Sequence, residues 1–134
     1  MNKVYLMLAA FCFTLLNISG DAFAAEHNNK ITVEAPYIRA TIPGTDITSA
    51  YMTIKNNGDE AAILIGVSSL FSDRIEIHQH MMSDGMMKMR KVEELAIKGR
   101  ETVILQPMGY HLMIFDVKKP LIPDEKVSLT LHFK

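Results

Sequence analysis

Two observations predict that this chain folds as an all-β sandwich. First, several short runs alternate apolar and polar side chains, as in residues 127–133, where every odd position is apolar. Second, turn-forming residues separate these runs at short intervals, for example Asn56-Asn57-Gly58 and Asp84-Gly85. No segment keeps a period of 3.6 residues over the length of a helix. Evenly spaced short strands of this kind are typical of a β-sandwich.

The first 24 residues are predicted to be a secretory signal peptide. Lys3 supplies a positive charge, residues 4–16 form an apolar run, and Ala22-Phe23-Ala24 matches an A-x-A cleavage site. The apolar run is too short for a membrane-spanning helix, which needs about 20 residues. We therefore expect cleavage after Ala24 and export of residues 25–134, as a single domain without membrane insertion, to the periplasm of a Gram-negative bacterium.

Cysteine and charge exclude several classes of function. The single cysteine, Cys12, lies in the signal peptide, and the preceding Phe11 is unlike the small residue that precedes a lipidated cysteine. The mature chain therefore has no disulfide, thiol nucleophile or thiolate ligand. A net charge of −1 provides no basic surface for nucleic acid.

The strands of the mature chain follow one another after a polar lead-in at residues 25–30. Glycine, proline or asparagine turns separate most of them. We predict strands over residues 31–39, 49–55, 61–67, 74–80, 87–93, 102–105, 110–117 and 127–133.

Methionine and histidine gather in one part of the chain. Seven of the ten methionines lie between residues 81 and 113, and three of the five histidines lie in or beside that window. A single methionine is usually core filler, which is how we interpret Met52, and His132 is interpreted as a polar surface residue. The cluster is different, because its methionines surround a tight turn beside Lys88 and Arg90, where little core is available.

Thioether and imidazole together indicate copper. Thioether sulfur is a soft, neutral ligand that suits Cu(I), and imidazole binds copper in either oxidation state. A blue-copper electron-transfer site would need a thiolate, which the mature chain lacks. No catalytic constellation such as HExxH or a phosphate-binding glycine loop is present, so we expect a binding protein and not an enzyme.

A hairpin at Asp84-Gly85 would bring the donors together. A two-residue turn there places His80 opposite Met89 and Met82 opposite Met87, on the same face as His78. The predicted strand 110–117 carries two more donors on one face, His111 and Met113. Glu76 shares the face of His78 and is either an acceptor for an imidazole N–H or a solvated strand residue.

The spacing of four of these residues resembles a known family. His78, Met89, His111 and Met113 fit the pattern H-x10-M-x21-H-x-M of the periplasmic copper chaperones of the PCu(A)C type, and the resemblance covers essentially the whole mature chain. It implies a cupredoxin-like Greek-key β-sandwich in which these four residues bind Cu(I). It also implies delivery of copper toward the dinuclear site of cytochrome c oxidase subunit II, with Sco-type proteins as partners.

Alternatives remain open at the level of residues and of function. His80 stands where relatives often have Met, and is either an additional ligand that favours Cu(II) or an exposed polar residue. Cleavage after Ala24 would make His27 the third residue of the mature chain. There the N-terminal amine, two backbone amides and the imidazole of His27 would bind Cu(II) in a square plane. The alternative is that His27 is a histidine without a role in a flexible tail. The same site would also serve a periplasmic copper buffer without a dedicated recipient, and we expect a monomer in either case.

Overall fold

The structure is a computed structural model that describes residues 30–134. The predicted signal peptide (1–24), Cys12 and His27 lie outside the described residues, so the cleavage site and the N-terminal Cu(II) site stay predictions. Within residues 30–134 the regular structure consists of β-strands, with no helix. No helix in this part of the chain is long and apolar enough to cross a membrane.

Nine strands form between residues 30 and 134. Most begin or end within a residue or two of the predicted bounds. They are β1 (Ile31–Ile38), β2 (Thr48–Asn56), β3 (Ala62–Ser68), β4 (Arg74–Ser83), β5 (Met86–Val92), β6 (Leu95–Ile97), β7 (Thr102–Leu105), β8 (Tyr110–Phe115) and β9 (Thr130–Phe133).

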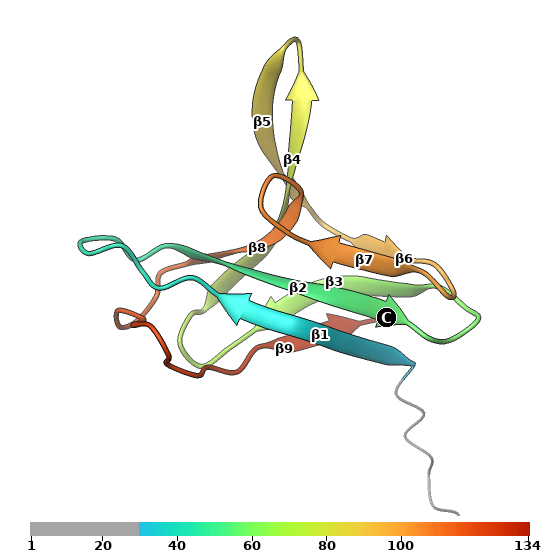
Figure 1. Cartoon of the computed structure of the whole chain (residues 1–134), viewed down its shortest axis with the longest axis horizontal. Helices are drawn as coiled ribbons and strands as arrows, with labels where there is room; N and C mark the ends of the chain where they lie inside the picture. The colour runs from blue at the N-terminus through green and yellow to red at the C-terminus, as the bar shows by residue number, and fades with distance from the viewer. Residues whose placement is uncertain (1–29) are drawn as a thin grey trace, which may run out of the picture.

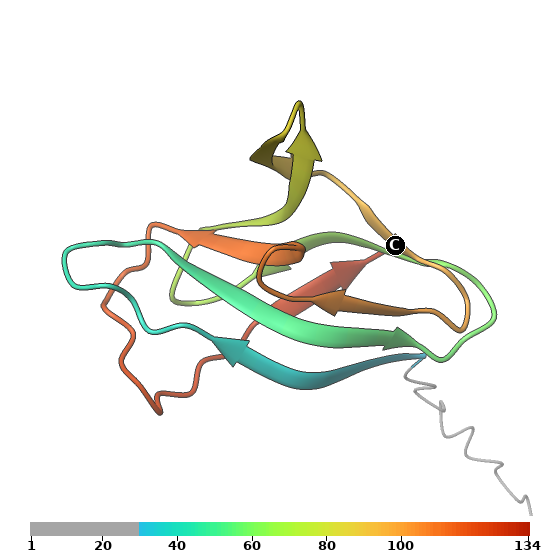
Figure 2. The same cartoon turned by 45° about the horizontal axis from the view of Figure 1, so that its top comes forward.

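The strands form two sheets that pack on each other (Figures 1 and 2). The large sheet has the order β1-β2-β7-β8-β4-β5, and the small sheet has the order β6-β3-β9. β2 is long enough to pair with β7 at one end and with β8 at the other. All pairs are antiparallel except the short contact of β7 with β8. The fold is a cupredoxin-like β-sandwich, as predicted.

Two elements differ from the sequence prediction. β6, with only three residues, was not predicted, because so short a strand shows no alternation. The last strand begins at Thr130, so the predicted start at Val127 was wrong. Val127 and Leu129 nevertheless pack against the core, so the alternation there correctly indicated burial without strand pairing.

Strand alternation divides the large sheet into a core face and an outer face. The core face contributes Met52 and Ile54 from β2, and Leu112 and Ile114 from β8, all at most 5% exposed. Met52 is therefore core filler, as predicted. Because successive side chains point to opposite faces, residues next to these, such as His111, lie on the outer face of the large sheet.

The β4–β5 hairpin projects beyond the sandwich (Figure 1). Its turn consists of Asp84 and Gly85, whose φ angles are 54° and 74°. Two positive φ values are what a type I′ turn requires, and Asp-Gly is a preferred sequence for it. The turn thereby sets the hairpin register on which the next section depends.

Candidate metal centre

The predicted ligands from β4 and β8 lie next to each other on the outer face of the large sheet. β4 and β8 are neighbouring antiparallel strands, and their register places His78 directly opposite His111 and Glu76 opposite Met113. The ring centroids of the two histidines are 5.9 Å apart. Residues 33 positions apart in sequence are thus brought into contact by strand pairing.

The hairpin adds the donors of β5. Its register pairs His80 with Met89 and Met82 with Met87, which confirms the arrangement predicted from Asp84-Gly85. His80 also reaches the ring of His111, with centroids 4.9 Å apart and the rings stacked at 28°. Met89 is 46% exposed, so it lies at the rim of the cluster and not within it.

β2 contributes a contact that sequence analysis did not foresee. Ser49 lies opposite Met113 in the β2–β8 pairing, and its hydroxyl donates a hydrogen bond to the Met113 sulfur over 3.8 Å. This contact holds the half-buried thioether in place. No local signal could have revealed it, because the pairing joins segments 64 residues apart.

Glu76 orients His78. The Nε2–H of His78 donates to one carboxylate oxygen of Glu76 over 2.8 Å, and Arg74 Nε donates to the other over 3.1 Å. The hydrogen bond from His78 is the main cause that lowers the pKa of Glu76 below its ordinary value, with Arg74 acting in the same direction. Glu76 is therefore an ionised acceptor at neutral pH, and the Nδ1 atom of His78 is left for another partner.

Gly109 orients His111 in the same way. The ring Nδ1–H of His111 donates to the carbonyl oxygen of Gly109 over 3.2 Å. The side chain is only 2% exposed, and this burial is the main cause that lowers its pKa below the usual 6.5. His111 is thus neutral at physiological pH, and its Nε2 lone pair is available.

Two buried ring nitrogens lack a partner in the described part of the chain. They are the Nδ1 atoms of His78 and His80. A buried polar atom without a hydrogen bond costs free energy, so an orphaned nitrogen in a native site calls for an unseen partner. A metal ion would satisfy such a nitrogen. In His78 the other ring nitrogen, Nε2, is hydrogen-bonded to the carboxylate of Glu76, and most metal-binding histidines have such an acceptor.

Histidines and carboxylates alone do not complete a metal site. Between residues 30 and 134 no group of three or more His, Cys, Asp or Glu side chains is placed to hold a metal ion. A centre at His78 and His111 would therefore depend on thioethers, for which the register offers Met113, two residues from His111 along β8, and Met89, opposite His80. That donor set of two imidazoles and two thioethers is neutral and soft, which suits Cu(I).

Aromatic rings flank the two histidines. The Tyr51 ring lies 6.5 Å from His111, and the Phe115 ring lies 6.0 Å from His78, measured between centroids. The guanidinium carbon of Arg74 lies over the Phe115 ring, 4.1 Å from its centroid. Phe115 could have been found from the sequence, because it continues the alternation of His111 and Met113 along β8. Tyr51 could not, because its place depends on β2 pairing with β8.

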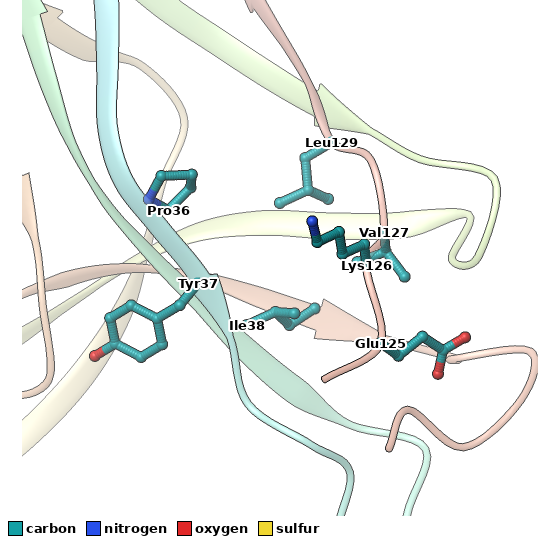
Figure 3. Close-up of a pocket in the computed structure, with 7 residues that line it drawn as sticks. All are labelled: Pro36, Tyr37, Ile38, Glu125, Lys126, Val127 and Leu129. Atoms are coloured by element: carbon teal, nitrogen blue, oxygen red, sulfur yellow. The ribbon is translucent and has the colours of Figure 1, made fainter. Parts of the chain in front are cut away.

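His132 and the groove beside β1 lie apart from the cluster. His132 is exposed and bonds to Ser68, as expected of a polar surface residue. A groove lies between Ile38 of β1 and the segment before β9, which includes Lys126 and Leu129 (Figure 3). No histidine or methionine lines this groove, so it offers no soft donor.

Comparison with known proteins extends over nearly all of the described chain. Residues 31–134 match the family model described as "Putative lipoprotein LpqE-like". "Putative lipoprotein Lxx21020" of Leifsonia xyli subsp. xyli is 29% identical over 104 residues, which are 77% of this chain and 61% of that protein. "Uncharacterized protein RP573" of Rickettsia prowazekii is 33% identical over 102 residues, which are 73% of this chain and 56% of that protein. The match therefore spans about three-fifths of the length of these relatives.

Solved structures with the same fold include copper-bound domains. The copper-bound PCuAC domain from PmoF2 superposes with a TM-score of 0.67 at 25% identity, covering 78% of this chain and 82% of that one. The solution structure of CuI-DR1885 from Deinococcus radiodurans superposes with a TM-score of 0.62 at 31% identity, covering 76% of this chain and 68% of that one.

Proposed function

Because the chain belongs to the LpqE-like family and shares the fold of PCuAC domains, we propose that it is an exported copper chaperone that carries Cu(I). The observation that carries this proposal is the pair His78 and His111. Each has one ring nitrogen hydrogen-bonded to an oxygen acceptor and the other available, and the two ring centroids are 5.9 Å apart, with Met113 two residues from His111 on the same face of β8.

The proposed ligands are His78, Met89, His111 and Met113, which we call the inner site. Two imidazoles that share one ion, at a metal–nitrogen distance of about 2.0 Å, have ring centroids roughly 5–6 Å apart. The observed 5.9 Å between His78 and His111 fits this value. His80 fits less well as a simultaneous ligand, because its ring is stacked on His111 and the two rings' lone pairs do not converge.

The inner site is suited to holding copper and releasing it. All four donors are neutral, so no proton is needed to displace a thioether, and none of them binds as firmly as a thiolate would. Met89 is half exposed on the projecting hairpin, whereas His111 is buried. We infer that Cu(I), which is cargo here, exchanges its ligands from the Met89 side.

The proposal includes the setting in which copper is carried. We place the protein in the periplasm as a monomer that delivers Cu(I) toward the dinuclear site of cytochrome c oxidase subunit II, with Sco-type proteins as partners. A periplasmic copper buffer would use the same inner site. The copper content of the oxidase in a deletion strain separates the two functions, since only loss of a delivery protein lowers it.

We propose His80 as an alternate ligand that helps the site accept Cu(II), which prefers nitrogen to thioether donors. Its buried Nδ1 has no hydrogen-bond partner between residues 30 and 134. The variant His80→Met should keep Cu(I) binding and weaken Cu(II) binding. Equal Cu(II) affinity in both proteins would remove His80 from the site.

Anaerobic Cu(I) titration against a competing chelator tests the inner site. We expect one tightly bound Cu(I), and Met113→Leu should weaken it by at least tenfold, since loss of even a group that supports a ligand costs about 10–100-fold. Met108→Leu is the matched control, because Met108 is exposed and lies outside the four ligands. Unchanged affinity in Met113→Leu would refute the assignment.

A further inference from the structure

The β4–β5 hairpin carries two methionines that the inner site does not use and that lie on the same face. Building on the proposed Cu(I) function, we propose that Met82 and Met87, here called the tip pair, form a second and weaker Cu(I) site. Through this site Cu(I) enters and leaves the inner site.

The hairpin register places the two thioethers side by side. Met82 lies directly opposite Met87, one pair before the Ser83–Met86 pair that flanks the turn. In an antiparallel ladder the pair next to a two-residue turn is hydrogen-bonded, so the Met82–Met87 pair is of the non-hydrogen-bonded kind. Such pairs have their Cα atoms only about 4.5 Å apart and their side chains close together. Two soft donors on one ion need this proximity.

The tip pair is continuous with the inner site. The next non-hydrogen-bonded pair on the same face is His80 opposite Met89, and His78 follows two residues further along β4. Two residues of a strand span about 6.8 Å. A methionine side chain has three rotatable bonds, so Met89 is able to reach an ion from either side. Met89 is thus the donor that the two sites share.

Exposure distinguishes the tip pair from packing residues. Met82 is 65% exposed and Met87 is 45% exposed, so neither contributes to the core of the sandwich. Their position near the projecting end of the hairpin (Figure 1) places them farther from the sandwich than any donor of the inner site. A role in packing does not explain two adjacent thioethers at this position.

Charge separates the two faces of the hairpin. Met81 and Met86 lie on the opposite face, which they share with Lys88 and Arg90. Cations on that face repel a copper ion, whereas the face of Met82 and Met87 presents neutral donors. On the latter face Lys91 lies opposite His78, but its ammonium group is paired with Glu93 at 3.2 Å.

The number of donors gives the transfer a direction. The tip pair offers two thioethers, while the inner site offers two imidazoles and two thioethers, so Cu(I) binds the inner site more tightly. Transfer between them is ligand exchange at one ion. The oxidation state stays Cu(I), and no proton is released because thioethers are neutral and carry none.

Nuclear magnetic resonance with methionine methyl groups labelled by ¹³C tests the two sites separately. The probe is Ag(I), a redox-inert ion that takes the same soft ligands as Cu(I). The first equivalent should shift the methyl signals of Met89 and Met113, and further Ag(I) should shift those of Met82 and Met87. Met81 and Met86, which belong to the same hairpin but to its other face, are the internal control and should stay unchanged.

The two proposals fail in different ways. If the first equivalent leaves Met89 and Met113 unshifted, the inner site and with it the proposed function are wrong. If Met89 and Met113 shift, but excess Ag(I) moves Met82 and Met87 no more than Met81 and Met86, only the tip pair is refuted.

Transfer kinetics supply a second, independent test. In the double variant Met82→Leu/Met87→Leu, Cu(I) uptake from and release to a chelator should slow about tenfold, equivalent to roughly 1.4 kcal/mol in the barrier. The equilibrium affinity of the inner site should not change. Met81→Leu/Met86→Leu is the control and should keep wild-type rates. Equal rates in the two double variants would overturn the role of the tip pair.

Discussion

His78 and His111, which lie opposite each other on β4 and β8, each have one ring nitrogen hydrogen-bonded to an oxygen acceptor of the protein. Glu76 accepts from His78 and Gly109 accepts from His111, so the tautomer and direction of both rings are set by neighbouring groups. A ligand held in its binding orientation loses less conformational entropy when the ion binds. The acceptors should therefore contribute to affinity although they do not touch the metal.

Replacing the carboxylate of Glu76 tests this contribution. Glu76→Gln keeps the size of the side chain but removes the charge that orients and polarises His78, so Cu(I) affinity should fall about 10–100-fold. Competition titration with a Cu(I) chelator measures the change. Glu34→Gln is the control, because Glu34 pairs with Lys55 on β1 and β2, away from the histidines. An affinity in Glu76→Gln equal to that of the control would contradict the orienting role.

The buried His111 should make the stability of the metal-free protein depend on pH. Burial holds its pKa below the usual 6.5, so the unfolded chain takes up a proton at a higher pH than the folded one. The free energy of unfolding should therefore decrease as pH falls through 6.5, and the decrease should end once pH is below the folded pKa. Urea unfolding of the metal-free protein at a series of pH values measures it.

His111→Gln should flatten that pH dependence, and His132→Gln should leave it intact. His132 is exposed and lies apart from His111, so it is the matched control for the loss of an imidazole ring. The explanation fails if the wild type and His111→Gln lose stability in parallel.

At the scale of the element, the hairpin turn decides which side chains share a face. A shift of one residue in the register of β5 would turn Met87 and Met89 away from the histidines and turn Lys88 and Arg90 toward them, because side chains alternate with a period of two. Asp84 and Gly85 prevent this shift by adopting positive φ angles of 54° and 74°. The structure confirms the predicted register. It could be predicted because the preference of Asp-Gly for a two-residue hairpin turn is a local property of the sequence.

Gly85→Ala should weaken the hairpin. Holding alanine in the left-handed region costs about 1–2 kcal/mol, so amide exchange in β4 and β5 should accelerate and Cu(I) affinity should fall as Met89 loses its position. Gly66→Ala is the matched control, since Gly66 also lies beside open space but without a positive φ. Slow exchange in the Gly85→Ala hairpin, equal to that of the control, would contradict the role of the turn.

At the scale of the whole molecule, the sandwich core supports the outer face from behind. Leu112 lies between His111 and Met113 in β8, is fully buried and packs in the core, while its two neighbours face outward. The same strand therefore anchors the sheet with one side chain and presents ligands with the next. Stability and copper binding are consequently carried by different residues of β8.

Leu112→Ala should separate these two properties. Removal of a fully buried leucine side chain costs about 2–5 kcal/mol of unfolding free energy. Below the lowered unfolding temperature, Cu(I) should still bind with near wild-type affinity, because all four donors remain. Ile104→Ala is the control, since Ile104 is 51% exposed and should change stability by only about 0.5 kcal/mol. Thermal unfolding and Cu(I) titration of both variants provide the comparison.

The sequence by itself determined the all-β class, most strand positions, the hairpin register and the donors that share its face. These follow from local rules, namely side-chain alternation and the conformation that Asp-Gly prefers in a turn. The family resemblance added the prediction that four residues at the motif's spacing are the copper ligands, namely His78, Met89, His111 and Met113. The start of β9 was predicted too early, because alternation reports burial and not pairing partners.

Only the tertiary structure decided how distant segments meet. That β8 lies between β4 and β2 sets His78 against His111 and brings Ser49 to the sulfur of Met113. It also decides which nitrogen of each ring has an acceptor and which is left without one. Strand order depends on how the two sheets bury their apolar faces together, a property of the whole chain, so the contacts among the ligands could not be derived from the residues around each of them.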